Sequence, residues 1–211
     1  MLGRRIPRIP VFAVWSVFSQ RKSQTMDWQT AFEVGLDYRT FLEVHGAASH
    51  RDRWQAIYRR VDLSPSQLAL LGGFARRMNV LCLAGTWCGD CASQCPILQR
   101  FAEATDAIAL RFLDRDQHLD IQSRLTINGG QRVPVVVFLS EDFHECGRYG
   151  ERTISKYREL ARTLTGAACP TGIGSNDETL PASVTAEWLT EFERIQLMLR
   201  LSPRLRQLHG D

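Results

Sequence analysis

Two cysteines in the segment Trp87-Cys88-Gly89-Asp90-Cys91 have the spacing that redox chemistry uses. A pair separated by two residues at the start of a helix can close a disulfide within one turn. At that position the helix offers unpaired amide donors and a partial positive charge, which stabilise a thiolate at Cys88. Cys88 could then attack a disulfide, and Cys91, one turn further in, could resolve the mixed disulfide. The segment therefore predicts catalytic thiol–disulfide exchange.

The other cysteines raise a competing hypothesis, a metal site. Cys82 and Cys95 flank the pair, so four thiolates lie within fourteen residues, the number that a structural zinc takes. However, Cys82 lies on a predicted strand and Cys95 one helical turn beyond the pair, which makes convergence on one tetrahedron awkward. We expect no metal, a buried core thiol at Cys82 and a packed helix residue at Cys95. Cys146 and Cys169 show no spacing that assigns them a role.

The elements around the pair predict an α/β domain. A continuous apolar run at 80–84 is typical of a central strand, and the cysteine segment follows it at the start of a helix that extends to about 104. A second strand is expected at 108–113, so the two strands should be parallel. Beyond a short helix and the turn Asn128-Gly129-Gly130, the patterns predict strands at 133–139 and 145–149 and a helix at 153–164. The result is a mixed four-stranded sheet flanked by helices.

With these elements in place, the chain resembles the thioredoxin family. That family carries a tryptophan directly before a Cys-Gly-x-Cys pair, as in the segment from Trp87 to Cys91, and a helix-kinking proline where Pro96 stands. Val133-Pro134, ahead of a β-run, is similar to the family's cis-proline loop. The resemblance implies a thioredoxin fold over about 63–166, with Trp87, Val133, Pro134 and Gly150 beside the substrate groove.

Two departures from the family pattern concern redox tuning. Asp90 stands where classical thioredoxins have proline, and Cys82 where they keep a buried acid. Asp90 adds negative charge beside the thiolate, which raises its pKa, although the same charge favours the helix terminus. We therefore expect Gly89 and Asp90 to tune the redox potential, in a direction that the sequence leaves open.

The remaining sequence divides around this domain. We expect a leader at 1–25 that is disordered or not translated, a helical extension at 26–62, the thioredoxin-like domain at 63–168, a linker at 169–182, and a C-terminal helix with a fraying basic tail at 183–211. One helix is expected from about 27 to 45, a second at 50–61 and a third that Ser64-Pro65 opens. The final helix should run from about 184 to 201.

Composition excludes several classes of protein. The chain has 211 residues, of which 44% are hydrophobic, and 26 basic side chains against 23 acidic ones leave a net charge of +3. This charge is too small and dispersed to favour nucleic acid. The apolar run at 11–18 is too short to span a membrane and lacks a signal-peptide cleavage site, so we expect a cytoplasmic protein.

The leading hypothesis is a protein-disulfide reductase that needs no prosthetic group and uses Cys88 and Cys91. Its partners would be protein disulfides and a reductase or small thiol that donates electrons. The alternative is a redox-gated interaction module with little turnover, whose terminal helices, at 27–61 and 184–201, bind a partner.

Overall fold

A four-stranded mixed sheet forms the centre of the computed structural model, which describes residues 26–165 and 179–211. The strands are β1 (Met78–Ala84), β2 (Ile108–Asp114), β3 (Val135–Leu139) and β4 (Glu145–Gly150), arranged in the order β2-β1-β3-β4. β1 pairs in parallel with β2, and β3 is antiparallel to both β1 and β4. The predicted fold class, an α/β thioredoxin fold, is confirmed.

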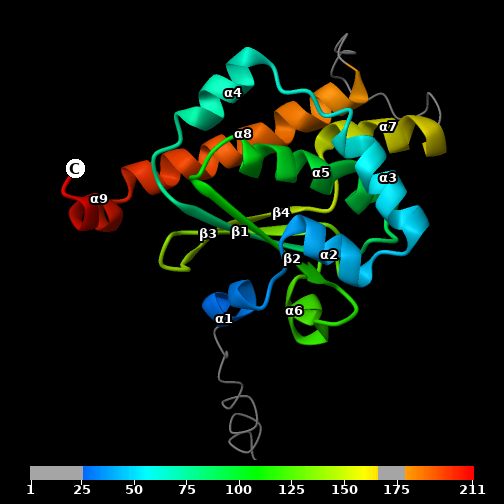
Figure 1. Ribbon diagram of the computed structural model, residues 1–211, viewed down its shortest axis with the longest axis horizontal. Coiled ribbons are helices and arrows are strands. Elements are labelled where there is room, and N and C mark those ends of the chain that lie inside the picture. The colour runs from blue at the N-terminus through cyan, green and yellow to red at the C-terminus, as the bar shows by residue number, and fades with distance from the viewer. Residues whose placement is uncertain (1–25, 166–178) are drawn as a thin grey trace, which may run out of the picture.

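The helices cover both faces of the sheet (Figure 1). Helices α4 (Pro65–Gly72), α5 (Gly89–Glu103) and α8 (Leu180–Leu201) lie on one side, whereas α1 (Trp28–Glu33) and α6 (Leu119–Arg124) lie on the other. α2 (Tyr38–His45) packs against β2 and α3 (Ala48–Tyr58) against α5, while α7 (Ile154–Thr165) lies along α8. Every residue of β1 and β3 is buried, as two covered faces require.

The N-terminal extension differs from the single helix predicted at 27–45. The chain forms two helices, because Asp37 caps a new helix by accepting hydrogen bonds from the backbone and hydroxyl of Thr40. Between the helices, Leu36 exchanges backbone hydrogen bonds with Phe112 at the free edge of β2. The apolar spacing that predicted one helix thus continues through the segment between the two helices, where Leu36 pairs with β2 and covers the edge of the sheet.

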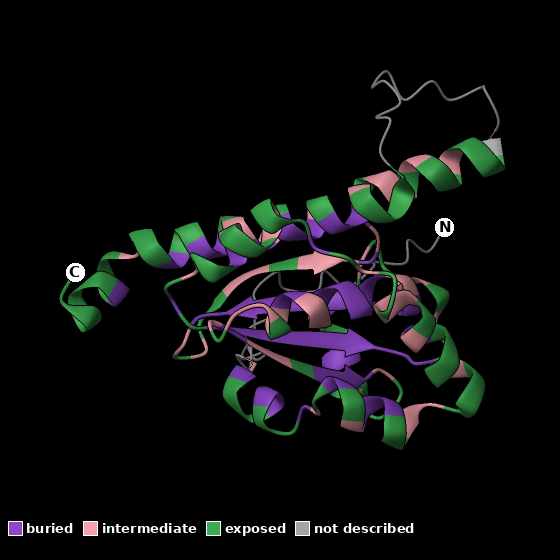
Figure 2. Ribbon diagram, turned by 45° about the horizontal axis from the view of Figure 1, so that its top comes forward, coloured by how far each residue is buried: buried purple, intermediate pink, exposed green. Residues whose placement is uncertain are grey.

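The C-terminal part is more ordered than predicted. α8 begins at Leu180, within the range predicted as linker, and one face of it is buried (Figure 2). Trp188 and Phe192 belong to this face. The basic tail does not fray but forms α9 (Pro203–His209), because Ser202 caps this helix and Leu205 is fully buried. The predicted leader at 1–25 and the linker residues 169–178, including Cys169, lie outside the described residues.

Candidate redox site

Cys88 lies at the junction of β1 and α5, where it is the N-cap residue of the helix. Its side chain is partly exposed, and its thiol lies 3.6 Å from the carbonyl oxygen of Val133, to which it can donate a hydrogen bond. The interaction with Cys91 and partial burial raise the pKa of Cys88, and the backbone N–H groups of Cys91 and Asp90 offset only part of this rise. Cys88 is therefore the cysteine of the pair that a substrate can reach.

Cys91 lies one turn further along α5 and is fully buried. The backbone N–H of Gly85, at the end of β1, donates to its sulfur at 3.4 Å. Its thiol also interacts with the side chains of Cys88 and Cys95. Cys91 therefore stands behind Cys88 in the position that a resolving thiol needs.

The two thiols titrate as a unit because they hydrogen-bond each other. Burial raises the pKa of Cys91, yet hydrogen bonds with Cys88, Cys95 and the Gly85 N–H outweigh burial and lower this pKa to about 5. The bond to Cys91, followed by partial burial, raises the pKa of Cys88. Between these two ionisations the pair holds one proton and one negative charge. The sequence analysis expected the charge on Cys88; in the structure the single negative charge belongs to the coupled pair of Cys88 and Cys91.

The loop before β3 forms the wall opposite Cys88. The Val133–Pro134 peptide bond is cis, the conformation expected from the resemblance. Gly150, at the end of β4, pairs with Val135 and lies against the loop: its φ is +150°, and a Cβ there would collide with the carbonyl oxygen of Pro134. The predicted groove residues Val133, Pro134 and Gly150 are therefore adjacent in the structure, and the Val133 carbonyl faces the thiol of Cys88.

Trp87 presents an indole ring to solvent directly beside Cys88, with 43% of its surface exposed. The guanidinium of Arg115 lies 4.7 Å from the centre of the ring, and the indole N–H donates to Asp116 at 3.2 Å. Arg53, from α3, donates to the Trp87 carbonyl at 3.0 Å. An exposed aromatic ring held on several sides offers a preorganised contact surface.

Asp90, the variable residue between the cysteines, is held by two cations near the start of α7. One of its carboxylate oxygens lies 2.6 Å from the Arg152 guanidinium, and the other lies 3.1 Å from the ammonium of Lys156. All three side chains are about four-fifths buried, at 19%, 21% and 17% exposed. These pairs neutralise the carboxylate beside the thiols. No local pattern predicts these pairs, because the partners lie more than sixty residues away.

Buried hydrogen bonds of one polar side chain, Gln94, also connect α5 to its neighbours. The fully buried Gln94 donates to the backbone carbonyl of Glu151 at 2.8 Å and accepts from the indole N–H of Trp188 at 3.0 Å. These bonds connect the active-site helix with the loop after β4 and with α8. Buried polar groups that are all partnered fix one packing arrangement.

The flanking cysteines pack in the core, as predicted for each separately. Cys82 and Cys95 are both fully buried, but they also contact each other, which the sequence analysis did not foresee. Over residues 26–165 and 179–211, no group of three or more His, Cys, Asp or Glu side chains is arranged to hold a metal ion. The four-thiolate arrangement considered for zinc is therefore not formed by these side chains.

Comparison with known proteins places this fold and site in a class. The structure is similar to a protein of unknown function from Pseudomonas aeruginosa, with a TM-score of 0.64 and 19% identity over 81% of this chain and 97% of that one. It is also similar to an HIV epitope-scaffold, with a TM-score of 0.59 and 21% identity over 79% and 99% of the two chains. Both similarities concern the fold, which is that of thioredoxin-like proteins.

The family assignment comes from the sequence match. A family model described as thioredoxin matches residues 35–164, so the chain belongs to the thioredoxin family. The match begins earlier than the predicted domain start at residue 63 and takes in α2 and α3. No curated protein matches the chain. Among the helices of the described part of the chain, none combines the length and apolar character needed to cross a bilayer.

Proposed function

We propose that this protein is a thiol–disulfide oxidoreductase that reduces or exchanges protein disulfides through Cys88 and Cys91. The observation that carries the proposal is the arrangement of the two sulfurs: one partly exposed at a helix N-terminus and the other fully buried behind it, joined by a hydrogen bond. Exchange chemistry needs one sulfur that a substrate can reach and a second that the substrate cannot.

In the proposed reaction, the proton of Cys88 passes to Cys91 and the Cys88 thiolate attacks a substrate disulfide. One substrate sulfur leaves as a thiolate, and a mixed disulfide remains on Cys88. Cys91 then gives its proton to the departing substrate thiolate and attacks the Cys88 sulfur, which releases the second substrate sulfur as a thiolate and leaves the Cys88–Cys91 disulfide. A cytoplasmic reductase or a small thiol would restore the dithiol.

The surface around Cys88 suits an extended peptide. The Val133 carbonyl lies 3.6 Å from the Cys88 thiol, in a loop where Val133 and Pro134 are buried, and Trp87, directly before Cys88, exposes its ring. We propose that these residues, with Gly150, bind the substrate chain beside its disulfide. The polar backbone of the loop would supply main-chain contacts, and the indole would supply apolar area.

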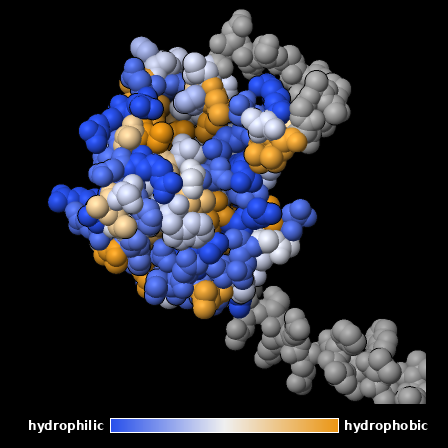
Figure 3. Space-filling view, turned by 90° about the vertical axis from the view of Figure 1, so that its right-hand side faces the viewer, coloured by the Kyte–Doolittle hydropathy of each residue, from blue (hydrophilic) through white to orange (hydrophobic). Residues whose placement is uncertain are grey.

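The alternative is an interaction module whose terminal helices bind a partner, and much of the apolar surface of these helices is used within the domain. The apolar faces of α2, α3 and α8 are buried against the domain, with Phe41, Trp54 and Trp188 fully covered. On the face shown in Figure 3, apolar residues form small groups among hydrophilic ones. The terminal helices thus complete the core of the domain.

Turnover tests the proposal directly. With dithiothreitol as electron donor and insulin as substrate, the wild-type protein should accelerate insulin reduction over the donor alone, whereas Cys88→Ser and Cys91→Ser should not. Cys146→Ser, outside the site, should keep the wild-type rate. A wild-type protein whose dithiol titrates, but which produces no acceleration with insulin or other protein disulfides, would support the interaction module instead.

A further inference from the structure

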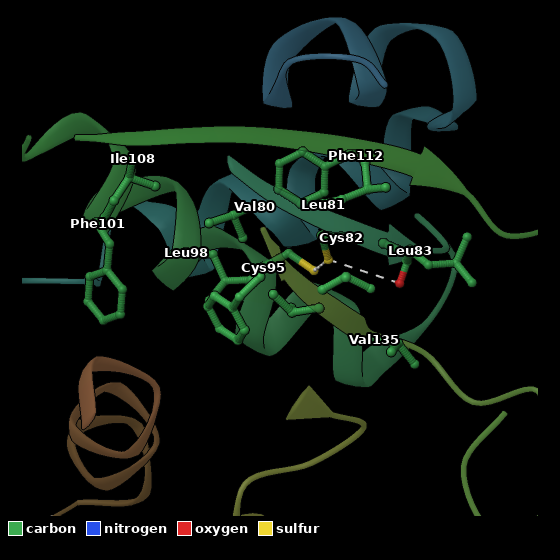
Figure 4. Close-up of a cluster of buried hydrophobic side chains, with 14 of the residues drawn as sticks. Val80, Leu81, Cys82, Leu83, Cys95, Leu98, Phe101, Ile108, Phe112 and Val135 are labelled. Carbon is green, nitrogen blue, oxygen red and sulfur yellow. Dashed lines mark hydrogen bonds between the residues drawn. The ribbon is translucent and has the colours of Figure 1, made fainter. Parts of the chain in front are cut away.

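A second pair of thiols lies behind the first, in the core of the domain. Cys82 lies in the middle of β1 and Cys95 on the face of α5 that packs on it, with 3.8 Å between the two sulfur atoms (Figure 4). Neither side chain has any exposed surface. The exchange reaction proposed above uses neither of them.

The sulfurs form a continuous series from the surface to the core. Cys95 follows Cys91 by four residues, so the two lie on the same face of α5, and their side chains hydrogen-bond. Cys91 also bonds Cys88, and Cys95 contacts Cys82. Each sulfur therefore interacts with the next one, and of the four only Cys88, the first, is open to solvent.

We propose that Cys82 and Cys95 are a second redox-active dithiol, oxidised from within by the Cys88–Cys91 disulfide. This inference rests on the proposed function, since that reaction forms the first disulfide. Cys95 attacks the sulfur of Cys91: the Cys91–Cys95 bond forms, the Cys88–Cys91 bond breaks, and Cys88 takes up the proton that Cys95 loses. Cys82 then attacks Cys95, the Cys82–Cys95 bond forms, and Cys91 leaves with the proton of Cys82.

These two exchanges conserve electrons and protons. The outer pair returns to the dithiol state and the inner pair becomes a disulfide, so no further oxidant is required. With its outer pair reduced again, the protein can reduce a second substrate disulfide. One chain would thus carry four electrons where a single cysteine pair carries two.

Burial determines how the inner pair can react. An external disulfide cannot reach sulfurs with no exposed surface, so the series through Cys91 is the only route on the described structure. Burial, together with hydrogen bonds to Cys82 and Cys91, raises the pKa of Cys95 well above the ordinary thiol value. Its thiolate is therefore scarce, which predicts that the internal transfer is slower than exchange at Cys88. The sulfurs of Cys82 and Cys95 must also approach from 3.8 Å to bonding distance, about 2.05 Å.

Oxidant uptake tests the proposal. A Cys146→Ser/Cys169→Ser protein, reduced under argon, is treated with one and then two equivalents of diamide, alkylated under denaturing conditions, and mapped by mass spectrometry. We expect a second equivalent to be consumed slowly and a Cys82–Cys95 disulfide to appear. In this background, Cys82→Ala should halve the total uptake and still form the Cys88–Cys91 disulfide. Cys95→Ala provides a second variant should Cys82→Ala not fold.

The route is tested with Cys88→Ser in the same background, in which the inner pair should remain reduced. Rapid formation of the inner disulfide in this variant would contradict internal transfer. A parent protein that forms the Cys88–Cys91 disulfide but keeps Cys82 and Cys95 as free thiols with excess diamide would overturn this inference and leave the proposed function intact. Failure to form even the outer disulfide would overturn both.

Discussion

Arg152 lies 2.6 Å from the carboxylate of Asp90 and so connects the loop that leads into α7 to the first turn of the active-site helix. The negative charge of Asp90 acts to raise the pKa of Cys91, and the ion pair offsets part of this charge. Classical thioredoxins have a proline at the position of Asp90. Here the acid lies between the two cysteines, and its charge is balanced by Arg152.

Removing this cation should make the dithiol harder to ionise. In Arg152→Gln, Asp90 keeps its ion pair with Lys156 but loses the guanidinium. The pKa of the first ionisation of the cysteine pair should therefore rise by a few tenths to about one pH unit. The measurement is the pH dependence of Cys88 alkylation by iodoacetamide. Arg162→Gln is the matched control, since Arg162 lies on α7 and pairs with Glu159 at the surface. Equal shifts in both variants would rule out a local effect of Arg152.

The shared proton predicts an unusual pH profile for the wild-type protein. The pKa of Cys91 is lowered to about 5, so below this pH both sulfurs are protonated and unreactive, and above it the pair holds one thiolate. Alkylation of Cys88 should therefore rise through an inflection near pH 5 and not near the ordinary thiol value of about 8.5. In Cys91→Ala the pair is lost, and the inflection should move up toward the ordinary value. An inflection at the same pH in both proteins would show that the pair does not share a proton.

Gln94 is predicted to be a stability determinant of the active-site helix. Gln94→Leu leaves the indole N–H of Trp188 and the carbonyl of Glu151 buried without their partner. Each unsatisfied group costs about 1–3 kcal/mol, so the free energy of unfolding should fall by about 2–4 kcal/mol in urea denaturation. Gln99→Leu, on the same helix, loses only a surface bond to Glu103 and should change stability by less than about 0.5 kcal/mol. If the free energy of unfolding falls no more in Gln94→Leu than in this control, the hydrogen bonds of Gln94 do not stabilise the helix as expected.

Trp87 is predicted to affect recognition of protein substrates more than reactivity. In Trp87→Ala the groove loses its aromatic surface, while Cys88 keeps its helix terminus and its buried partner. Reduction of insulin should therefore lose about 5–30-fold in kcat/KM, as expected for an aromatic contact of 1–2 kcal/mol. The rate with a small aromatic disulfide such as 5,5′-dithiobis(2-nitrobenzoic acid) should change less than twofold. An equal loss with both substrates would show that Trp87 supports the thiol and not the substrate.

Local signals predicted the centre of the fold and the cysteine pair. The buried run of β1 and the cysteine spacing at the start of α5 are both properties of neighbouring residues, as is the Val133-Pro134 dipeptide. The break between α1 and α2 was missed because the apolar spacing continues through it. The signal that could have found it is Gly35 followed by a capping residue, Asp37, with Thr40 three positions later.

The features that could not be predicted from the sequence depend on tertiary packing. The cations that hold Asp90 and the bonds of Gln94 join elements that lie far apart along the chain. The contact between Cys82 and Cys95 depends on how α5 sits on the sheet, which spacing along the chain does not determine. α9 was missed for a similar reason: Leu205 is its buried residue, and the packing of Leu205 into the core depends on residues distant in sequence.

Trapping of a mixed disulfide is the most direct test of thiol–disulfide exchange in this protein. Cys91→Ser removes the resolving sulfur, so attack on insulin should stop at a covalent adduct on Cys88 that mass spectrometry can locate. We expect this adduct with Cys91→Ser and none with Cys88→Ser, which lacks the attacking sulfur. No adduct with either variant, or the same adduct with both, would contradict a nucleophilic role for Cys88.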